Sequence, residues 1–249
     1  MNAYEQPIGK PSTRLSVGDD QQYLQRRSLR NKETEMKSLL IATSFVVCYI
    51  FAGPTLAKVV PATTQAAPPV LAPSGEYRLD PEHSSIVFRV KHLGMAWFPM
   101  RFTRFTADLG FNAQRPERST LNVSIDPTSI HTAVPPKPNE NFDEKIATNP
   151  DWLNGKTFPK IEFVSTRIER TGPATANIFG NLTIRGVTRP FVLETVFNGS
   201  MRAHPFSRRP LLGFSGQGSL KRSDFGMTTL IPMVGDEIRI AVEAELVTK

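Results

Sequence analysis

Thiol chemistry is nearly absent from this chain of 249 residues, because its single cysteine, Cys48, lies in an apolar N-terminal run. The chain after Cys48 has no thiol, which excludes disulfide bonds and cysteine catalysis from that part. Residues 45–47 lack the small side chain that a bacterial lipoprotein site requires before its cysteine. Cys48 is therefore not interpreted as a lipid anchor.

Two other kinds of chemistry lack their usual sequence patterns. No Gly-x-Ser-x-Gly nucleophile motif occurs, and the spacing in residues 213–216 is wrong for one. The four histidines, His83, His92, His131 and His204, show no recognised metal-ligand spacing. Since His83 and His92 differ by an odd number of positions, they point to opposite faces of a regular strand. We expect no catalytic residue, no metal site and no cofactor apart from a bound ligand.

Aromatic residues with a polar atom are scarce, with 2 Trp and 4 Tyr against 16 Phe. Phe brings no polar group that an interior must satisfy, so this composition suits an apolar core. The net charge is +7, but the basic residues are scattered singly, without a basic helical stripe or an aromatic RNA-binding pattern. We expect no nucleic-acid partner, whereas a modest, transient attraction to an anionic membrane surface is compatible with this charge.

An apolar stretch covers residues 38–51 and is shorter than the roughly 20 residues of a membrane-spanning helix. It follows Met36-Lys37 and leads to small residues that end at Ala57. This is the order of the basic, apolar and cleavage regions of a signal peptide. We predict a signal peptide over residues 36–57, cleaved after Ala57, and hence a periplasmic protein. An uncleaved anchor is the main alternative.

Two polar segments flank the predicted signal peptide. Residues 1–35 form a charged extension, which suggests a start codon assigned too far upstream. A twin-arginine export signal at Arg26-Arg27 is the competing interpretation. Residues 58–75 are rich in Ala, Pro and Thr, a composition that cannot bury a core and predicts a flexible tether. The folded domain is expected over residues 76–249.

Beyond Gly75 the apolar residues alternate with polar ones, which is the pattern of half-buried β-strands. Turn signals such as residues 198–200 separate the strands. Such strands predict an all-β fold, either a sandwich or a closed antiparallel β-barrel, and closure is favoured because it removes open edges. Residues 138–154 break the alternation and predict a short helical insertion that caps a barrel end.

The inward-facing side chains of these strands are the candidate binding residues. An eight-stranded barrel either fills its interior with side chains or holds one slim ligand, and the alternation alone leaves both open. Strand parity places these residues on the inner face: Ile86, Phe88, Val90, His92, Val123, Phe163, Leu182, Phe191, Leu193, Ile240 and Val242.

Three polar positions are given roles on the same grounds. His92 has the parity of the inner face and is expected to reach a ligand head group. His83 and Ser84 are expected to fix the entry of a strand by hydrogen bonds. Residues 222–226 are interpreted as a structural corner rather than a head-group site, with Arg222 pairing with a carboxylate.

Ordered blocks along the domain resemble the bacterial YceI family. The blocks are Tyr77-Arg78-Leu79-Asp80, His83-Ser84-Ser85-Ile86-Val87-Phe88, His92-Leu93-Gly94, Phe102-Thr103-Arg104-Phe105, Ser129-Ile130-His131-Thr132, Phe158-Pro159-Lys160-Ile161-Glu162-Phe163, residues 180–188, Arg222-Ser223-Asp224-Phe225-Gly226-Met227 and Val234-Gly235-Asp236. The resemblance implies a lipocalin-like antiparallel barrel, exported to the periplasm, whose tunnel holds an isoprenoid chain such as a quinone tail or a polyprenyl lipid. One position departs from the family, because Lys145 stands where a histidine is usual.

These observations favour a carrier or reservoir for an isoprenoid-type lipid. Two other classes of function remain open. One is an enzyme that acts on a prenyl or quinone compound, and the other is an interaction or adhesion module that uses the outer surface. The oligomeric state is also left open, a homodimer included.

Overall fold

The computed structural model describes residues 66, 68–135 and 137–249. The predicted polar extension and signal peptide, residues 1–35 and 36–57, lie outside this part. The described residues contain no helix whose length and apolar character would suit a membrane crossing.

Strands make up most of this region. They are β1 (Gly75–Leu79), β2 (Ser85–His92), β3 (Ala96–Phe102), β4 (Phe105–Phe111), β5 (Thr120–Ile125), β6 (Ile130–His131), β7 (Ile161–Arg170), β8 (Thr175–Ile184), β9 (Val187–Met201), β10 (Leu211–Lys221) and β11 (Val234–Thr248). The helices are the 3-10 turns η1 (Pro116–Arg118), η2 (Pro127–Ser129) and η3 (Arg222–Phe225), and α2 (Phe142–Thr148).

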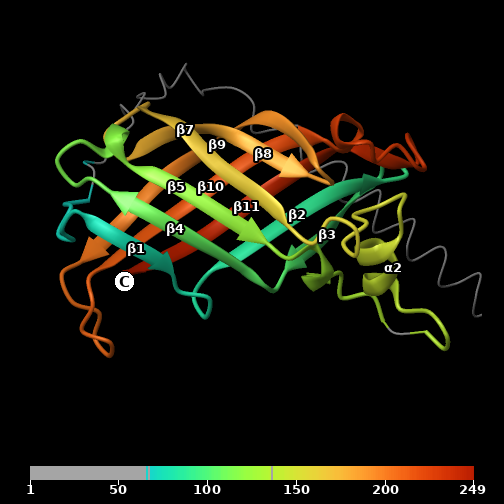
Figure 1. Ribbon diagram of the computed structural model, residues 1–249, viewed down its shortest axis with the longest axis horizontal. Coiled ribbons are helices and arrows are strands. Elements are labelled where there is room, and N and C mark those ends of the chain that lie inside the picture. Colours follow the sequence, from blue (N-terminus) through green and yellow to red (C-terminus); the bar gives the residue numbers. More distant parts are fainter. Residues whose placement is uncertain (1–65, 67, 136) are drawn as a thin grey trace, which may run out of the picture. The chain divides into compact units, whose positions relative to one another are not determined.

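The strands form a closed antiparallel ring with eight strand positions. β1 and β2 pair with successive parts of β11, so they are two halves of one broken strand. β4 and β3 form the next strand position in the same way, because β4 pairs with β1 and β3 pairs with β2. β5 and β6 form the third, because β5 pairs with β4 and β6 pairs with β3. The remaining strands follow in chain order from β7 to β11, which closes the ring (Figure 1). The prediction of a closed barrel is confirmed.

The breaks in the first three strand positions are fixed by polar side chains. The side chain of Asp126 accepts a hydrogen bond from the N–H of Thr128 at 2.7 Å, which caps η2. Arg104, in the break between β3 and β4, donates to the same carboxylate at 2.8 and 3.0 Å. The N–H of Thr103 donates to the carbonyl of Ser129 at 3.0 Å, so the neighbouring breaks are joined to each other.

The helical insertion is confirmed, because α2 lies inside the predicted residues 138–154. Figure 1 shows α2 at one end of the barrel, the end where β2, β8 and β10 terminate. Asn141 caps the helix by accepting a hydrogen bond from the N–H of Glu144 at 3.1 Å. Buried residues of the insertion, Ala147 and Leu153, belong to the main hydrophobic core inside the barrel.

The predicted tether, residues 58–75, differs from the structure in its last part. Residues 68–74, here called the strap, pack against the barrel, and Ala72 is buried. The Ser200 hydroxyl of β9 accepts from the N–H of Leu71 at 2.7 Å, and the Ser74 hydroxyl accepts from the N–H of Ala113 at 2.9 Å. Composition does not reveal these contacts, because a proline-rich segment makes few internal contacts and its partners lie on the barrel rim.

Candidate functional site

Strand parity sets the chemistry of the barrel interior. On β2 and β11 the even-numbered positions face inward, and on β9 the odd-numbered ones do. Two of the inward-facing glycines, Gly180 and Gly218, lie against aromatic rings. A Cβ at either would come within 2.5 Å of the ring of Phe163 or Phe191, respectively. These glycines leave room for the rings, which pack edge to face with centroids 5.9 Å apart.

The larger of two interior cavities, about 690 Å³ in volume, lies toward the α2 end. All eleven residues predicted from strand parity line it: Ile86, Phe88, Val90, His92, Val123, Phe163, Leu182, Phe191, Leu193, Ile240 and Val242. Side chains from β3 and the insertion complete the wall, among them Phe98, Met100, Phe102, Phe142, Ile146 and Trp152. Contact between these residues and a ligand remains a prediction, but the structure brings the whole predicted set together.

The mouth of the larger cavity is marked by residues that both line it and are exposed. They are His92, Lys145, Asp151 and Leu230. Lys145, the position that departs from the family pattern, also makes an ion pair with Glu140 at 3.5 Å. A cation therefore stands where a ligand head group would emerge.

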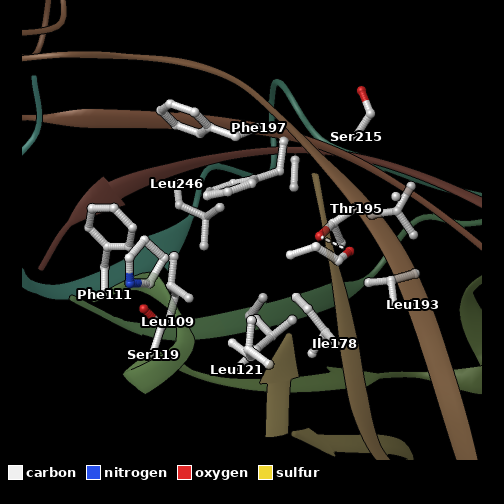
Figure 2. A pocket seen from close by; sticks show the side chains of 18 of the residues that line it. Leu109, Phe111, Ser119, Leu121, Ile178, Leu193, Thr195, Phe197, Ser215 and Leu246 are labelled. Atoms are coloured by element: carbon white, nitrogen blue, oxygen red, sulfur yellow. Dashed lines mark hydrogen bonds between the residues drawn. The ribbon is translucent and has the colours of Figure 1, made fainter. Parts of the chain in front are cut away.

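A smaller cavity of about 390 Å³ lies toward the strap end (Figure 2). Its wall includes Leu109, Phe111, Leu121, Ile178, Phe197, Phe214 and Leu246, together with Pro68 and Val70 of the strap. The polar side chains in it are satisfied by the protein. Ser119 accepts from the N–H of Asn112 at 2.9 Å, and Thr195 donates to the carbonyl of Ala176 at 2.8 Å. An apolar ligand in this cavity would therefore leave no polar side chain of the wall without a hydrogen-bond partner.

The parity argument selected only part of the wall of this smaller cavity. Four of its residues, Leu121, Ile178, Phe197 and Leu246, belong to the same alternating strands as the predicted set. The inward-facing residues of β4 could have been identified from the alternation of Phe105, Ala107, Leu109 and Phe111 in the sequence.

The two cavities meet at one layer of side chains. Ile86, Val123, Leu193 and Val242 line both of them. They come from β2, β5, β9 and β11. The interior is therefore an apolar channel in two parts, and this layer, here called the shared layer, separates them.

Arg222 occupies a structural corner beside the larger cavity. It is 2 % exposed and donates to the carbonyls of Met227, Thr229, Val234 and Gly235 at 2.7 to 2.9 Å. Burial lowers the pKa of the Arg222 guanidinium, and the field of a nearby carboxylate, that of residue 236, opposes this shift. The corner interpretation is confirmed.

The expected partner of Arg222 was wrong, because backbone carbonyls rather than a carboxylate accept its hydrogen bonds. The Asp236 carboxylate instead accepts from the N–H and the hydroxyl of Ser223, at 2.9 and 2.8 Å. The tight loop between β10 and β11 presents several carbonyls to one point, which the sequence does not show.

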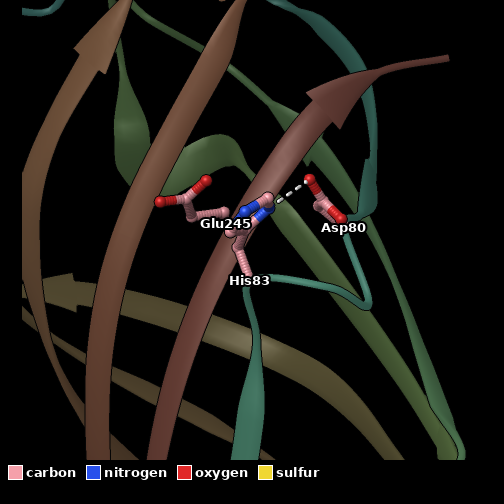
Figure 3. Close-up of side chains that lie close together, drawn as sticks. All are labelled: Asp80, His83 and Glu245. Atoms are coloured by element: carbon pink, nitrogen blue, oxygen red, sulfur yellow. Dashed lines mark hydrogen bonds and ion pairs between the residues drawn. The ribbon is translucent and has the colours of Figure 1, made fainter.

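His83, shown beside Asp80 in Figure 3, and Ser84 fix the start of β2, as predicted. His83 Nδ1 lies 3.0 Å from Asp80 Oδ2, and Ser84 Oγ accepts from the N–H of Glu245 at 3.1 Å. The hydrogen bond with His83 lowers the pKa of Asp80 and raises that of His83. Asp80, His83 and Glu245 each offer one atom that could bind a metal ion, and these three atoms lie within 4.8 Å of one another. Sequence spacing missed this group because β11 brings Glu245 from the far end of the domain.

One carboxylate joins α2 to the barrel. Asp143 accepts from the hydroxyl and N–H of Thr132, at 2.5 and 3.0 Å, and lies 3.0 Å from His131 Nδ1. Burial alone would raise the pKa of Asp143, but these hydrogen bonds hold it below its usual range. His131 belongs to the short strand β6.

A closed antiparallel barrel with an apolar channel and a polar mouth defines a lipocalin-like class of protein. Comparison with known proteins narrows this class. The YceI-like domain family matches residues 77–246, so the chain belongs to the YceI-like family, and the resemblance seen in its sequence blocks is confirmed. Protein YceI of Salmonella arizonae is 31% identical over 176 residues, which cover 70% of this chain and 87% of that protein.

Two solved structures share the fold. Burkholderia cenocepacia BcnA aligns with a TM-score of 0.58 and 22% identity, covering 67% of this chain and 98% of that one. A domain from Saccharophagus degradans, described as polyisoprenoid-binding and implicated in plant cell wall breakdown, aligns with a TM-score of 0.51 and 11% identity. That alignment covers 70% of this chain and 98% of that domain. At these identities the likeness concerns the fold.

Proposed function

We propose that this protein binds a long isoprenoid-type lipid, a quinone or a polyprenyl chain, and serves as its carrier or reservoir. One observation carries the proposal: two apolar cavities of about 690 and 390 Å³ meet end to end inside one barrel. Both volumes lie in the roughly 300–1,000 Å³ range of ligand pockets. The polyisoprenoid-binding description of a protein with the same fold supports it.

The shape of the interior favours a chain over a compact ligand. Ile238 and Leu246 of β11 line the two opposite cavities. At about 3.3 Å per residue these positions are about 26 Å apart along the strand. A flexible chain that fills this length gains roughly 25 cal/mol for each Å² of apolar surface removed from water, so it needs few polar contacts.

The polar groups at the mouth suit head-group recognition. His92 and Lys145 can donate hydrogen bonds to a carbonyl or phosphate oxygen, and both stand at the rim of the larger cavity. Arg222, the buried cation nearby, has its hydrogen bonds committed to backbone carbonyls. This arrangement supports binding without a chemical step.

Export to the periplasm is the second part of the proposal. It rests on the predicted signal peptide, residues 36–57. N-terminal sequencing of the protein recovered from its own host is expected to begin at Lys58. A chain that still carries residues 36–57 would contradict cleavage.

The cargo is tested by native mass spectrometry of the mature protein from its own host, followed by organic extraction. We expect one lipid per barrel, extracted as a quinone or a polyprenyl compound. Leu193→Trp fills the shared layer and is expected to reduce the bound chain length or the occupancy. Val192→Trp places the same side chain on the outer face of the same strand and serves as the matched control.

Two outcomes would contradict the proposal. One is a folded protein that carries no lipid and takes up no added isoprenoid. The other is equal lipid loading in the Leu193→Trp and Val192→Trp proteins. Turnover of a bound quinone that disappears in a His92→Ala variant would favour an enzyme instead.

A further inference from the structure

Large apolar side chains are exposed together at the α2 end of the barrel. Five of the twelve that are exposed in the described part of the chain lie in two loops there. Leu93 and Met95 belong to the turn between β2 and β3, and Leu230, Ile231 and Met233 to the loop before β11. The N–H of Leu93 donates to the carbonyl of Met233 at 2.6 Å, which holds the loops side by side. These five residues are called the apolar tip.

The apolar tip adjoins the mouth of the larger cavity. Leu230 belongs both to the tip and to the cavity wall. His92 and Thr229, which also line the cavity, are the chain neighbours of Leu93 and Leu230. Met95 is 83% exposed and Met233 53%, so neither side chain is covered by the barrel.

Basic side chains lie directly behind the apolar tip. Arg89, Lys91 and Arg101 lie on β2 and β3, and these two strands contain no acidic residue. Arg239 of β11 and Lys91 both approach the ring of Trp97, at 4.4 and 4.9 Å from its centroid. Of the acidic residues at this end of β11, Asp236 accepts from the N–H and hydroxyl of Ser223 at 2.9 and 2.8 Å, and Glu237 pairs with Arg239 at 3.0 Å.

The apolar tip is followed along the strands by Trp97 and by basic side chains, and residues at a membrane interface follow the same order. Apolar residues that project farthest suit the acyl boundary, Trp suits the head-group level, and Lys and Arg suit anionic phosphates. The mouth of the cavity lies within the same surface. A bilayer that covered it would face the apolar channel directly, without an intervening water layer.

We propose that the apolar tip inserts into the head-group region of an anionic lipid bilayer, with Arg89 and Lys91 against the lipid phosphates. Docking in this way places the mouth of the larger cavity on the membrane. The proposal rests on the carrier role for its purpose, but the contact itself requires no cargo. It assigns the membrane as partner and fixes which end of the barrel meets it.

The opposite end of the barrel offers the rival surface. Phe206 in the loop between β9 and β10 is 89% exposed, and Arg202, Arg208 and Arg209 lie beside it in sequence. Val70, Leu71 and Met201 are also exposed at this end, but Phe206, the most exposed of the four, does not line either cavity. The strap crosses this end of the barrel. The α2 end is therefore the better candidate.

Vesicle co-sedimentation of the mature protein tests the proposal. The probes are vesicles of phosphatidylglycerol with phosphatidylethanolamine and, for comparison, vesicles of phosphatidylcholine. We expect binding to the anionic vesicles that weakens with salt. The double variant Met95→Asp, Met233→Asp should weaken it about ten-fold or more, since it removes apolar insertion and adds negative charge. Val164→Asp changes an apolar residue on the outer face of β7 that is 50% exposed, close to the 53% of Met233, and is the control.

Three results would overturn the proposal. The first is an absence of binding by the wild-type protein. The second is unchanged binding by the Met95, Met233 double variant. The third is a loss of binding in Phe206→Asp that the double variant does not show, which would move the contact to the opposite end. Thermal unfolding verifies that each variant is folded.

The cargo is measured separately by native mass spectrometry of the same samples. A protein that carries lipid but does not bind vesicles would refute the docking surface and leave the carrier role intact. A protein that binds vesicles through the apolar tip but carries no lipid would refute the carrier role and support the docking surface.

Discussion

The two ends of the barrel are covered by different means. At one end the strap runs from Ser200 of β9 to the residues after β4, and these strands lie on opposite sides of the ring. Tyr77 and Leu212 beneath it are fully buried. At the other end a short helix is held mainly through Asp143, and the apolar tip and the cavity mouth remain exposed. One end is packed as a core, and the other is arranged for access.

This difference has an energetic basis. Buried Ala72, Tyr77 and Leu212 help to hold the strap end, together with hydrogen bonds from the strap backbone to the Ser200 hydroxyl, and buried apolar contacts are costly to open. α2 has one buried residue, Ala147, and is joined to the barrel by the part-buried hydrogen bonds of Asp143; short segments with few buried residues open readily. Ligand exchange is therefore expected through the α2 end.

The largest expected effect is that of Arg222→Met at the α2 end. Removing the guanidinium leaves backbone carbonyls buried without donors, so the free energy of unfolding should fall by about 3 kcal/mol. Arg185→Met is the control, because Arg185 is half-buried and donates a single hydrogen bond, to the carbonyl of Gly226 at 3.3 Å. Urea unfolding measures both. A loss below about 1 kcal/mol in Arg222→Met would show that water replaces the side chain.

A second variant tests the middle of the channel. Gly180→Ala places a Cβ 2.5 Å from the Phe163 ring and from the backbone carbonyl oxygen of Val164. We expect a loss of about 2 kcal/mol and a shifted ring, because the space is already filled. In the control, Gly213→Ala, the nearest atom is 3.8 Å from the new Cβ, and stability should change little. Equal urea midpoints for the two variants would contradict this packing.

Ser200→Ala tests the strap. The hydroxyl that accepts from the N–H of Leu71 is lost, so a destabilisation of about 1 kcal/mol is expected. Hydrogen exchange at Leu71 should become faster while exchange in α2 stays the same. Ser219→Ala removes an exposed hydroxyl on β10 and serves as the control. If exchange at Leu71 does not change, the strap is held by apolar contacts alone.

The smallest expected effect is the pH response of α2. The hydrogen bonds from Thr132 and His131 leave the pKa of Asp143 lowered in the folded protein. Its stabilising contribution is therefore present above the unfolded pKa of about 3.9 and is lost as the pH falls through the folded value. Hydrogen exchange across α2 should accelerate there, and Asp143→Asn should show faster exchange already at neutral pH. Exchange that does not depend on pH in the wild-type protein would exclude this role.

The sequence predicted the barrel because alternation is a local signal. Inward positions such as Phe88 and Ile240 are separated by two from their neighbours on the same face, so parity alone selects them. The helical insertion was equally visible, since the alternation stops there. What these predictions share is that each depends on residues close together in the chain.

The parts that could not be predicted depend on contacts between distant residues. Glu245 joins His83 only through the pairing of β11 with the start of β2, and the strap meets Ser200 across more than a hundred residues. The carbonyls around Arg222 converge because of loop geometry. Register and loop conformation decide these contacts, and neither is encoded in a short pattern.

The broken strand formed by β1 and β2 pairs with β11, and this pairing joins the two ends of the domain. The ladders from β7 to β11 connect neighbours in the chain, and contacts between chain neighbours are the quickest to form. A chain made from its N-terminus presents the 15 residues of β11 last. Until β11 pairs, the other strands form an open curved sheet with one apolar face. The enclosed interior in which a lipid could lie exists only after β11 has paired with β1 and β2.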